Sequence, residues 1–227
     1  YVQKQLLEQS IRAYLSPKLV KAFSSRQDEN FLKPGAKKQE LSILFSDIEG
    51  FTSLSEGMDS SELAKLMNGY FETTVSHGIH ATDGTVVKYI GDAIFAFWNA
   101  PEPQNDHATR ACEAAIQIQN QPYRFSESKP INTRIGIHSG SADVGNFGSE
   151  NRVDYTAIGE NINLAARLEG LNKHLGTRTL ISIDTRNAAS PSILTRDLGK
   201  FRLKGFERTV HVFELLSSND ATAADLS

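Results

Sequence analysis

The sequence predicts a mixed α/β fold of the α+β type, with a largely antiparallel sheet. Three observations lead to this class. Short apolar runs alternate along the chain with segments of helical periodicity. Two of these runs, 84–90 and 93–98, are separated only by Gly91-Asp92, which is typical of a hairpin with a tight turn. The predicted elements then follow the order β, α, β, β, α, β, with further helices and strands after them.

The composition excludes several classes of protein. With 227 residues, 39% of them hydrophobic, the chain can bury a sizeable core without disulfides or a structural metal. Because the chain has a single cysteine, Cys112, it cannot form an intrachain disulfide or a cysteine-rich zinc site. The net charge of −3 argues against nucleic acid as a partner. No membrane-spanning run or signal peptide is visible, so we expect a cytoplasmic domain, with any membrane anchor lying elsewhere in a longer protein.

Residues 1–39 are predicted to be a helical connector followed by a linker. Apolar residues recur at spacings of three and four over 2–15, which indicates an amphipathic helix. Ser16-Pro17 is typical of a cap and first position of a second helix, ending near Phe23. The polar segment 24–39, with the turn signal Pro34-Gly35, is interpreted as a linker. Because the chain starts at Tyr1 rather than methionine, we expect an upstream sensor domain in the full-length protein.

Residues 40–216 are predicted to form the main body, and 217–227 a flexible tail. A capping sequence, Asp59-Ser60-Ser61-Glu62, predicts the start of one helix. Two further helices are predicted at 106–118 and 160–171. Besides the hairpin, strands are predicted at 41–45, 132–138 and 179–183, and within 201–216. Residues 141–144 are a possible strand that returns beside 132–138.

Two carboxylates carry the most information about function. Asp47 ends a buried strand and precedes Gly50, where a helix can start, and Asp92 lies at the tip of the hairpin. Each has a simple structural interpretation, Asp47 as a helix N-cap and Asp92 as a turn residue. If their strands are neighbours, both acids emerge at one edge of the sheet. Converging carboxylates next to a helix start can bind divalent cations and phosphate oxygens.

Three segments resemble the motifs of the class III nucleotidyl cyclases, in the same order. They are Phe45-Ser46-Asp47-Ile48-Glu49-Gly50-Phe51-Thr52-Ser53-Leu54, Lys88-Tyr89-Ile90-Gly91-Asp92-Ala93, and 154–169, which includes Asn163-Leu164-Ala165-Ala166-Arg167. The resemblance extends over nearly the whole of residues 40–215. It implies the ferredoxin-like βαββαβ core of that family, with extra strands and helices.

The resemblance also implies roles for individual residues. Asp47 and Asp92, with the Ile48 carbonyl, would hold two Mg²⁺ or Mn²⁺ ions in each site. Backbone groups near Phe51 and Thr52, and the Lys204 side chain, would contact the phosphates. Lys88 and Thr156 would read the base, Asn163 would orient the ribose, and Arg167 would neutralise charge at the α-phosphorus. In this family the sites lie at a homodimer interface, so the metal aspartates come from one subunit and Lys88, Thr156, Asn163, Arg167 and Lys204 from its partner.

Elementary chemistry agrees with several of these roles but leaves alternatives open. Asn163 and Arg167 are four residues apart and share one helix face, and a guanidinium can meet two phosphate oxygens at once. Without the other motifs, the favoured interpretation of Arg167 is an ion pair with Glu160 or Glu169 along the helix. Lys88 likewise has the interpretation of an ordinary solvent-facing strand lysine.

The predicted function is that of an adenylyl cyclase, which converts ATP to cyclic AMP and pyrophosphate for intracellular signalling. A guanylyl cyclase is the nearest alternative, although Lys88 can only donate, which suits N1 of adenine rather than the N1–H of guanine. A catalytically inactive, cyclase-like dimerisation domain is the second alternative. Thr156 stands where many adenylyl cyclases have Asp, as in a subgroup often activated by bicarbonate, so bicarbonate is a possible ligand.

Overall fold

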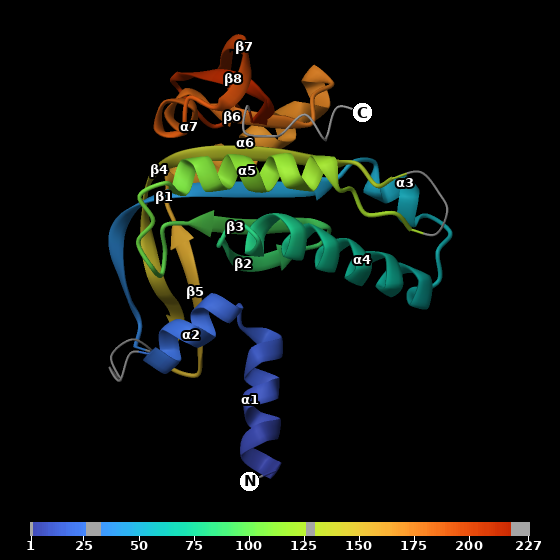
Figure 1. The fold of residues 1–227 in the computed structure, drawn as a ribbon, viewed down its shortest axis with the longest axis vertical. Coiled ribbons are helices and arrows are strands. Elements are labelled where there is room, and N and C mark those ends of the chain that lie inside the picture. Colours follow the sequence, from blue (N-terminus) through green and yellow to red (C-terminus); the bar gives the residue numbers. More distant parts are fainter. Residues whose placement is uncertain (1, 26–32, 126–129, 219–227) are drawn as a thin grey trace.

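The N-terminal segment forms two helices that precede the sheet in the chain (Figure 1). The computed structural model describes residues 2–25, 33–125 and 130–218. As predicted, α1 (Val2–Tyr14) and α2 (Pro17–Ser25) are separated at Ser16, whose side-chain oxygen accepts from the Leu19 N–H. Helix α1 points away from the body and leaves Leu6, Ile11 and Tyr14 exposed. Among the residues described, no helix has the length and apolarity needed to cross a membrane.

The described residues build one eight-stranded sheet with the order β2-β3-β1-β4-β6-β8-β7, and β5 pairs with β4. Among the described strands, only β4 and β6 pair in parallel, so the predicted antiparallel character is confirmed. The first four strands, with helices in their connections, form the predicted βαββαβ core. The strands are β1 (Gly35–Ile48), β2 (Thr85–Ile90), β3 (Ala93–Trp98), β4 (Thr133–Ser149), β5 (Arg152–Ile158), β6 (Thr179–Ser182), β7 (Ile193–Arg202) and β8 (Thr209–Ser218).

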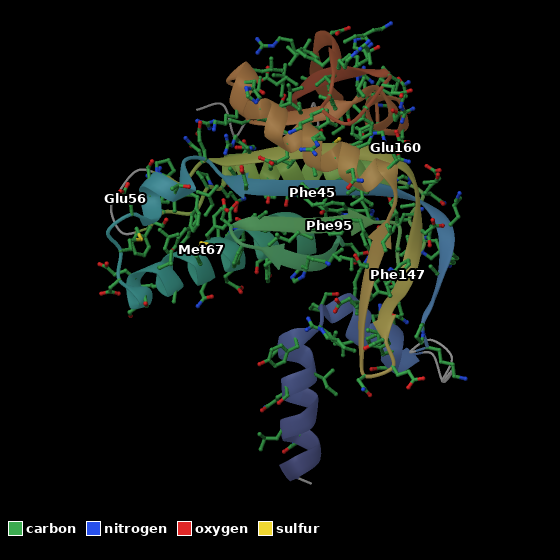
Figure 2. All side chains as sticks on the ribbon, turned by 180° about the vertical axis from the view of Figure 1, so that it is seen from behind. Phe45, Glu56, Met67, Phe95, Phe147 and Glu160 are labelled. Atoms are coloured by element: carbon green, nitrogen blue, oxygen red, sulfur yellow. The ribbon has the colours of Figure 1, made fainter. Side chains whose placement is uncertain are left out.

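Helices cover both faces of the sheet (Figures 1 and 2). On one face lie α4 (Ser60–Thr74), the π-helix η2 (Val75–His80) and α5 (His107–Asn120), which pack against apolar side chains such as Ile94 and Trp98. Asp59 caps α4 in the predicted capping box with Glu62. On the other face lies α6 (Glu160–Leu175), near the stacked rings of Phe45 and Phe95. The short helices are α3 (Phe51–Ser55) and α7 (Ile183–Ala188).

Two predictions about strands were wrong, and strand β5 was not predicted. Strand β4 continues for 17 residues, so 141–144 is not a returning strand. Strand β1 starts at Gly35, within the segment interpreted as a linker, and its first four residues are exposed. These distal halves of β1 and β4 pair with each other, and β5 pairs with β4, beyond the helices. The exposed start of β1 gives no local strand signal, whereas residues 152–157 alternate strictly between polar and apolar side chains, so a signal for β5 was present in the sequence and was missed.

The C-terminal region also differs in detail from the prediction. Strand β7 begins at Ile193, before the predicted segment, and helix α7 was not predicted. Strand β8 extends to Ser218, two residues into the predicted tail. The rest of that tail lies outside the described residues, as does much of the linker.

Helix α6 packs closely against β4 at Gly136. A Cβ atom at that position would lie 2.1 Å from the backbone nitrogen of Glu169. We therefore expect Gly136→Ala to lower the free energy of unfolding by about 3 kcal/mol, since the helix backbone must move. Gly170→Ala is the matched control on α6, because nothing lies within 4 Å of its Cβ. It is expected to be stabilising by about 0.5–1 kcal/mol in urea denaturation; equal losses in both variants would contradict this packing.

Candidate active site

The two predicted metal carboxylates lie together at one edge of the sheet. Asp47 is the second-last residue of β1, and Asp92 lies in the turn between β2 and β3. Strand β3 pairs directly with β1. The Asp92 carboxylate accepts a hydrogen bond from the Ile48 N–H at 3.0 Å. This bond joins the hairpin tip to the residue after Asp47. The N-cap of α3 is Gly50, so Asp47 is not a helix cap.

Arg134 is a site residue that the sequence analysis missed. It lies opposite Asp47 in the pairing of β1 with β4. Its guanidinium binds both carboxylate oxygens of Asp47, with Nε and Nη2 at 3.0 and 3.1 Å. Such two-point pairs are the strong form of a charge-assisted hydrogen bond. A signal was present in the sequence, because Arg134 is a charged residue directly before the buried apolar run 135–137 of the same strand.

Glu169 adds a third acid beside this pair. Its Oε1 lies 3.9 Å from Arg134 Nε, too far for a hydrogen bond, and has no hydrogen-bond partner among the described residues. Burial and the neighbouring Asp47 raise the pKa of Glu169 to about 8, although Arg134 opposes this shift. The site is therefore rich in acids with one arginine to offset them, and one buried carboxylate oxygen remains unsatisfied.

This donor set fits a hard divalent cation. Asp47 and Asp92 supply carboxylate oxygens. The raised pKa of Glu169 indicates that Arg134 does not fully offset the negative charge of the neighbouring acids. Among the described residues, no group of three or more His, Cys, Asp or Glu side chains is placed to hold a metal alone. One or two carboxylates combined with substrate phosphates is the usual arrangement for Mg²⁺ at nucleotide sites. The residues present thus fit a cation that arrives with a phosphorylated substrate.

Phe51 and Thr52 form the first turn of α3, directly after the carboxylate segment. Gly50 adopts a left-handed conformation, with φ of 69°, which turns the chain from the end of β1 into the helix. The first N–H groups of a helix have no partner within it, so they are available to an external acceptor. The predicted phosphate-facing segment therefore lies next to the carboxylates.

Arg167 and Lys204 come together on the far side of α6. Both line a cavity of about 320 Å³, together with His174 and Arg202. Asn163 lies one turn before Arg167, and both side chains are exposed. The alternative ion pairs of Arg167 are not favoured by the structure: Glu160 is 4.0 Å from Arg208, and Glu169 faces Arg134. The cavity collects positive charge suited to phosphate oxygens.

The two groups of site residues face different ways from α6. Glu169 faces β1 and Asp47, whereas Arg167, two residues earlier, is exposed. Two residues along a helix are about 200° apart around its axis. Arg167 is consequently turned away from Asp47 of its own chain.

Lys88 and Thr156, the predicted base-reading residues, are placed separately. Lys88 is exposed on β2 and lines a cavity of about 420 Å³ whose wall includes Tyr14 and Pro17, at the junction of α1 and α2. Thr156 is buried on β5, opposite Gly145 of β4, and does not line that cavity.

Comparison with known proteins gives consistent matches. The family described as Adenylate and Guanylate cyclase catalytic domain matches residues 34–217. Adenylate cyclase 1 of Rhizobium meliloti is 36% identical over 187 residues, which are 80% of this chain and 28% of that protein. The crystal structure of the adenylyl cyclase CyaB from P. aeruginosa has 32% identity and a TM-score of 0.72, with coverage of 82% of this chain and 97% of that one.

A guanylyl cyclase is similarly close. The crystal structure of the guanylyl cyclase Cya2 has 30% identity and a TM-score of 0.75, and covers 84% of this chain and 98% of that one. The chain spans less than half the length of the curated adenylate cyclases of Rhizobium meliloti and Anabaena cylindrica, 28% and 42% respectively. The matched region includes the acidic edge of the sheet and helix α6. The chain therefore belongs to the family of class III adenylyl and guanylyl cyclase catalytic domains.

Proposed function

We propose that this chain is the catalytic domain of an adenylyl cyclase. In the reaction, the ribose 3′-hydroxyl of ATP gives its proton to water and its oxygen bonds to the α-phosphorus. The bond from that phosphorus to the bridging oxygen of the β-phosphate breaks, and pyrophosphate leaves. The observation that carries the proposal is the bond between Asp92 and the Ile48 N–H, which brings two carboxylates together beside the first turn of α3. Family membership makes nucleotide cyclisation the chemistry to expect there.

Asp47, Asp92 and the Ile48 carbonyl would hold two Mg²⁺ or Mn²⁺ ions. When bound, these ions lower the pKa of the attacking hydroxyl and neutralise the triphosphate. Arg134 would then exchange part of its contact with Asp47 for a phosphate oxygen, because a guanidinium can serve either anion. The N–H groups of Phe51 and Thr52 would bind further phosphate oxygens.

The other half of each site would come from a second copy of the chain. Arg167 is turned away from its own Asp47, so a partner is needed to bring a guanidinium to the α-phosphorus. Lys204 lines the same cavity as Arg167 and would bind the terminal phosphates. Asn163, one turn away on α6, would orient the ribose. A homodimer with two equivalent shared sites follows from this arrangement.

Lys88 and Thr156 of that partner would select the base. A lysine can donate to N1 of adenine, whereas N1 of guanine carries a hydrogen and repels a donor. The similarity to a guanylyl cyclase structure keeps GTP as the alternative substrate. An inactive regulatory domain is disfavoured, because Asp47, Asp92, Asn163 and Arg167 are all present.

The test is to incubate the purified chain with Mn²⁺ and either ATP or GTP and to identify the products by mass. We expect cyclic AMP and pyrophosphate, with a higher kcat/KM for ATP. Cyclic GMP as the main product would support the alternative, and no cyclic nucleotide from a dimeric, folded chain would contradict a catalytic role. The cytoplasmic location and upstream sensor domain stay predictions.

Bicarbonate is expected to raise turnover at constant pH and ionic strength. Thr156 carries no charge, so a small anion near the base pocket meets less repulsion than it would beside an aspartate. Thr156→Asp should therefore weaken the response. Chloride at equal ionic strength is the control, since salt alone screens phosphate binding. Equal responses to both anions would show that bicarbonate has no specific effect.

A further inference from the structure

A continuous line of polar side chains connects the start of α5 with the first turn of α6. It begins at His107, the first residue of α5, and ends at His138 on β4. The hydroxyl groups of Ser42, Ser139, Thr185 and Ser182 connect the two imidazoles. The contacts between successive members measure 2.8, 2.7, 3.0, 3.3 and 2.7 Å. All four hydroxyl-bearing residues are buried, and buried hydroxyls are as a rule hydrogen-bonded.

Asn161 fixes the tautomer of His138. The Asn161 amide nitrogen donates to the Ser141 carbonyl at 2.8 Å, so its oxygen must face His138 Nε2, also at 2.8 Å. Nε2 therefore carries the hydrogen. In a neutral imidazole, Nδ1 is then an acceptor and takes its hydrogen bond from Ser182.

Counting hydrogens extends this result to His107. The line has five contacts and four hydroxyl hydrogens, so a fifth hydrogen must come from one of the imidazoles. The Thr185 hydroxyl has one other acceptor, the Ile137 carbonyl at 3.5 Å, which is farther away than Ser182. With His138 Nδ1 as an acceptor and all five contacts formed, every hydroxyl points toward His138 and the fifth hydrogen lies on His107 Nδ1. If the hydroxyl groups pointed toward His107 instead, His138 Nδ1 would have to donate as well. His138 would then carry a hydrogen on both nitrogens and a positive charge. The states of the two histidines are thereby coupled.

The environment of His138 favours its neutral form. Burial lowers the pKa of His138. Asp184 on α7, 3.9 Å away, and Glu160 on α6 favour the charged form, whereas Arg208 before β8 opposes it. Burial likewise lowers the pKa of His107, against Glu40 and Asp106. Both imidazoles border a cavity of about 610 Å³, which gives the line contact with solvent.

Helix α6 depends on this end of the line for its position. Its N-cap, Gly159, offers no side-chain cap, so the Asn161 side chain anchors the first turn to β4. Contact is close, because a Cβ at Gly140 would lie 2.6 Å from the Asn161 amide. The helix runs from Asn161 beside His138 to Glu169 beside Arg134, about 12 Å along both the helix and β4. Asn163 and Arg167 lie between these two anchors.

We propose that His138 and Asn161 are positioning residues of the cyclase site. The line of hydroxyl groups holds them in one hydrogen-bonded state, and they in turn fix the positions of Asn163 and Arg167 on α6. Their effect on turnover rests on the proposed function, whereas the hydrogen-bonded state and the anchoring of α6 do not.

Histidine nitrogen NMR tests the line without any turnover. In the unaltered protein near neutral pH, we expect His138 as the Nε2–H tautomer and His107 as the Nδ1–H tautomer. Ser139→Ala interrupts the line, frees Ser42 to donate to His107, and should lower the Nδ1–H population of His107 while His138 keeps its tautomer. Finding His107 as Nε2–H in the unaltered protein would overturn the coupling.

Asn161→Ala tests the positioning, with Asn187→Ala as the matched control. Asn187 borders the same cavity but is outside the line. Hydrogen exchange in the first turn of α6 should accelerate in Asn161→Ala alone, and kcat should fall about 10- to 100-fold with KM changed by less than about twofold. Unchanged exchange in Asn161→Ala, or equal effects in both variants, would overturn the proposal. If the unaltered chain forms no cyclic nucleotide, the proposed function fails, and the exchange and NMR results still decide this inference.

Discussion

Asp47→Asn and Asp92→Asn are each expected to reduce kcat/KM with Mn²⁺ and ATP by at least about 100-fold, corresponding to about 3 kcal/mol of barrier. An amide keeps the size of the carboxylate but removes the charge that a divalent cation needs. Because the two acids adjoin the same backbone segment, either loss should disable the whole site. The measurement is steady-state formation of cyclic AMP.

Asp106→Asn is the matched control for these variants. Asp106 accepts from Arg110 at 2.6 Å in an ion pair away from the acidic edge, much as Asp47 pairs with Arg134. It should leave kcat/KM unchanged. Thermal unfolding of all three variants should show that they remain folded. More than a tenth of the original rate in both folded active-site variants would contradict the assigned roles of Asp47 and Asp92.

The parts of the fold that the sequence predicted well are those with local causes. The hairpin before Trp98 depends on a two-residue turn, and α4 depends on a capping box within four residues. The sequence also placed Asp47 and Asp92 at strand ends, so their meeting required only that β1 and β3 be neighbours. Local signals therefore gave one half of the candidate site.

The missed parts depend on contacts between distant segments. Arg134 meets Asp47 across 87 residues, and the contact exists only because β4 pairs with β1 in one particular register. The distal part of β4, residues 140–149, contains three glycines, which are depleted in strands, and this hides its continuation, whereas β5 alternates between polar and apolar residues and could have been predicted. Glu169 was considered only as a helical ion-pair partner of Arg167, because its approach to Asp47 requires the close packing of α6 at Gly136.

Mixing Asp92→Ala and Arg167→Ala chains is expected to restore activity that neither variant has alone. In a dimer of either variant, both shared sites lack one essential group. In a mixed dimer, Asp92 comes from one chain and Arg167 from the other, so one of the two sites is intact. Random assortment makes half of the dimers mixed, each with one working site, so the mixture should recover about a quarter of the original rate.

Cyclic AMP formation by this mixture tests the central claim most directly, because it requires ATP cyclisation and a site shared between two chains. Differently tagged chains, co-purified in sequence, would establish that mixed dimers form. The account predicts near-zero rates for each variant alone and recovery on mixing. A mixture that stays as inactive as its parents, although mixed dimers are present, would contradict the shared site.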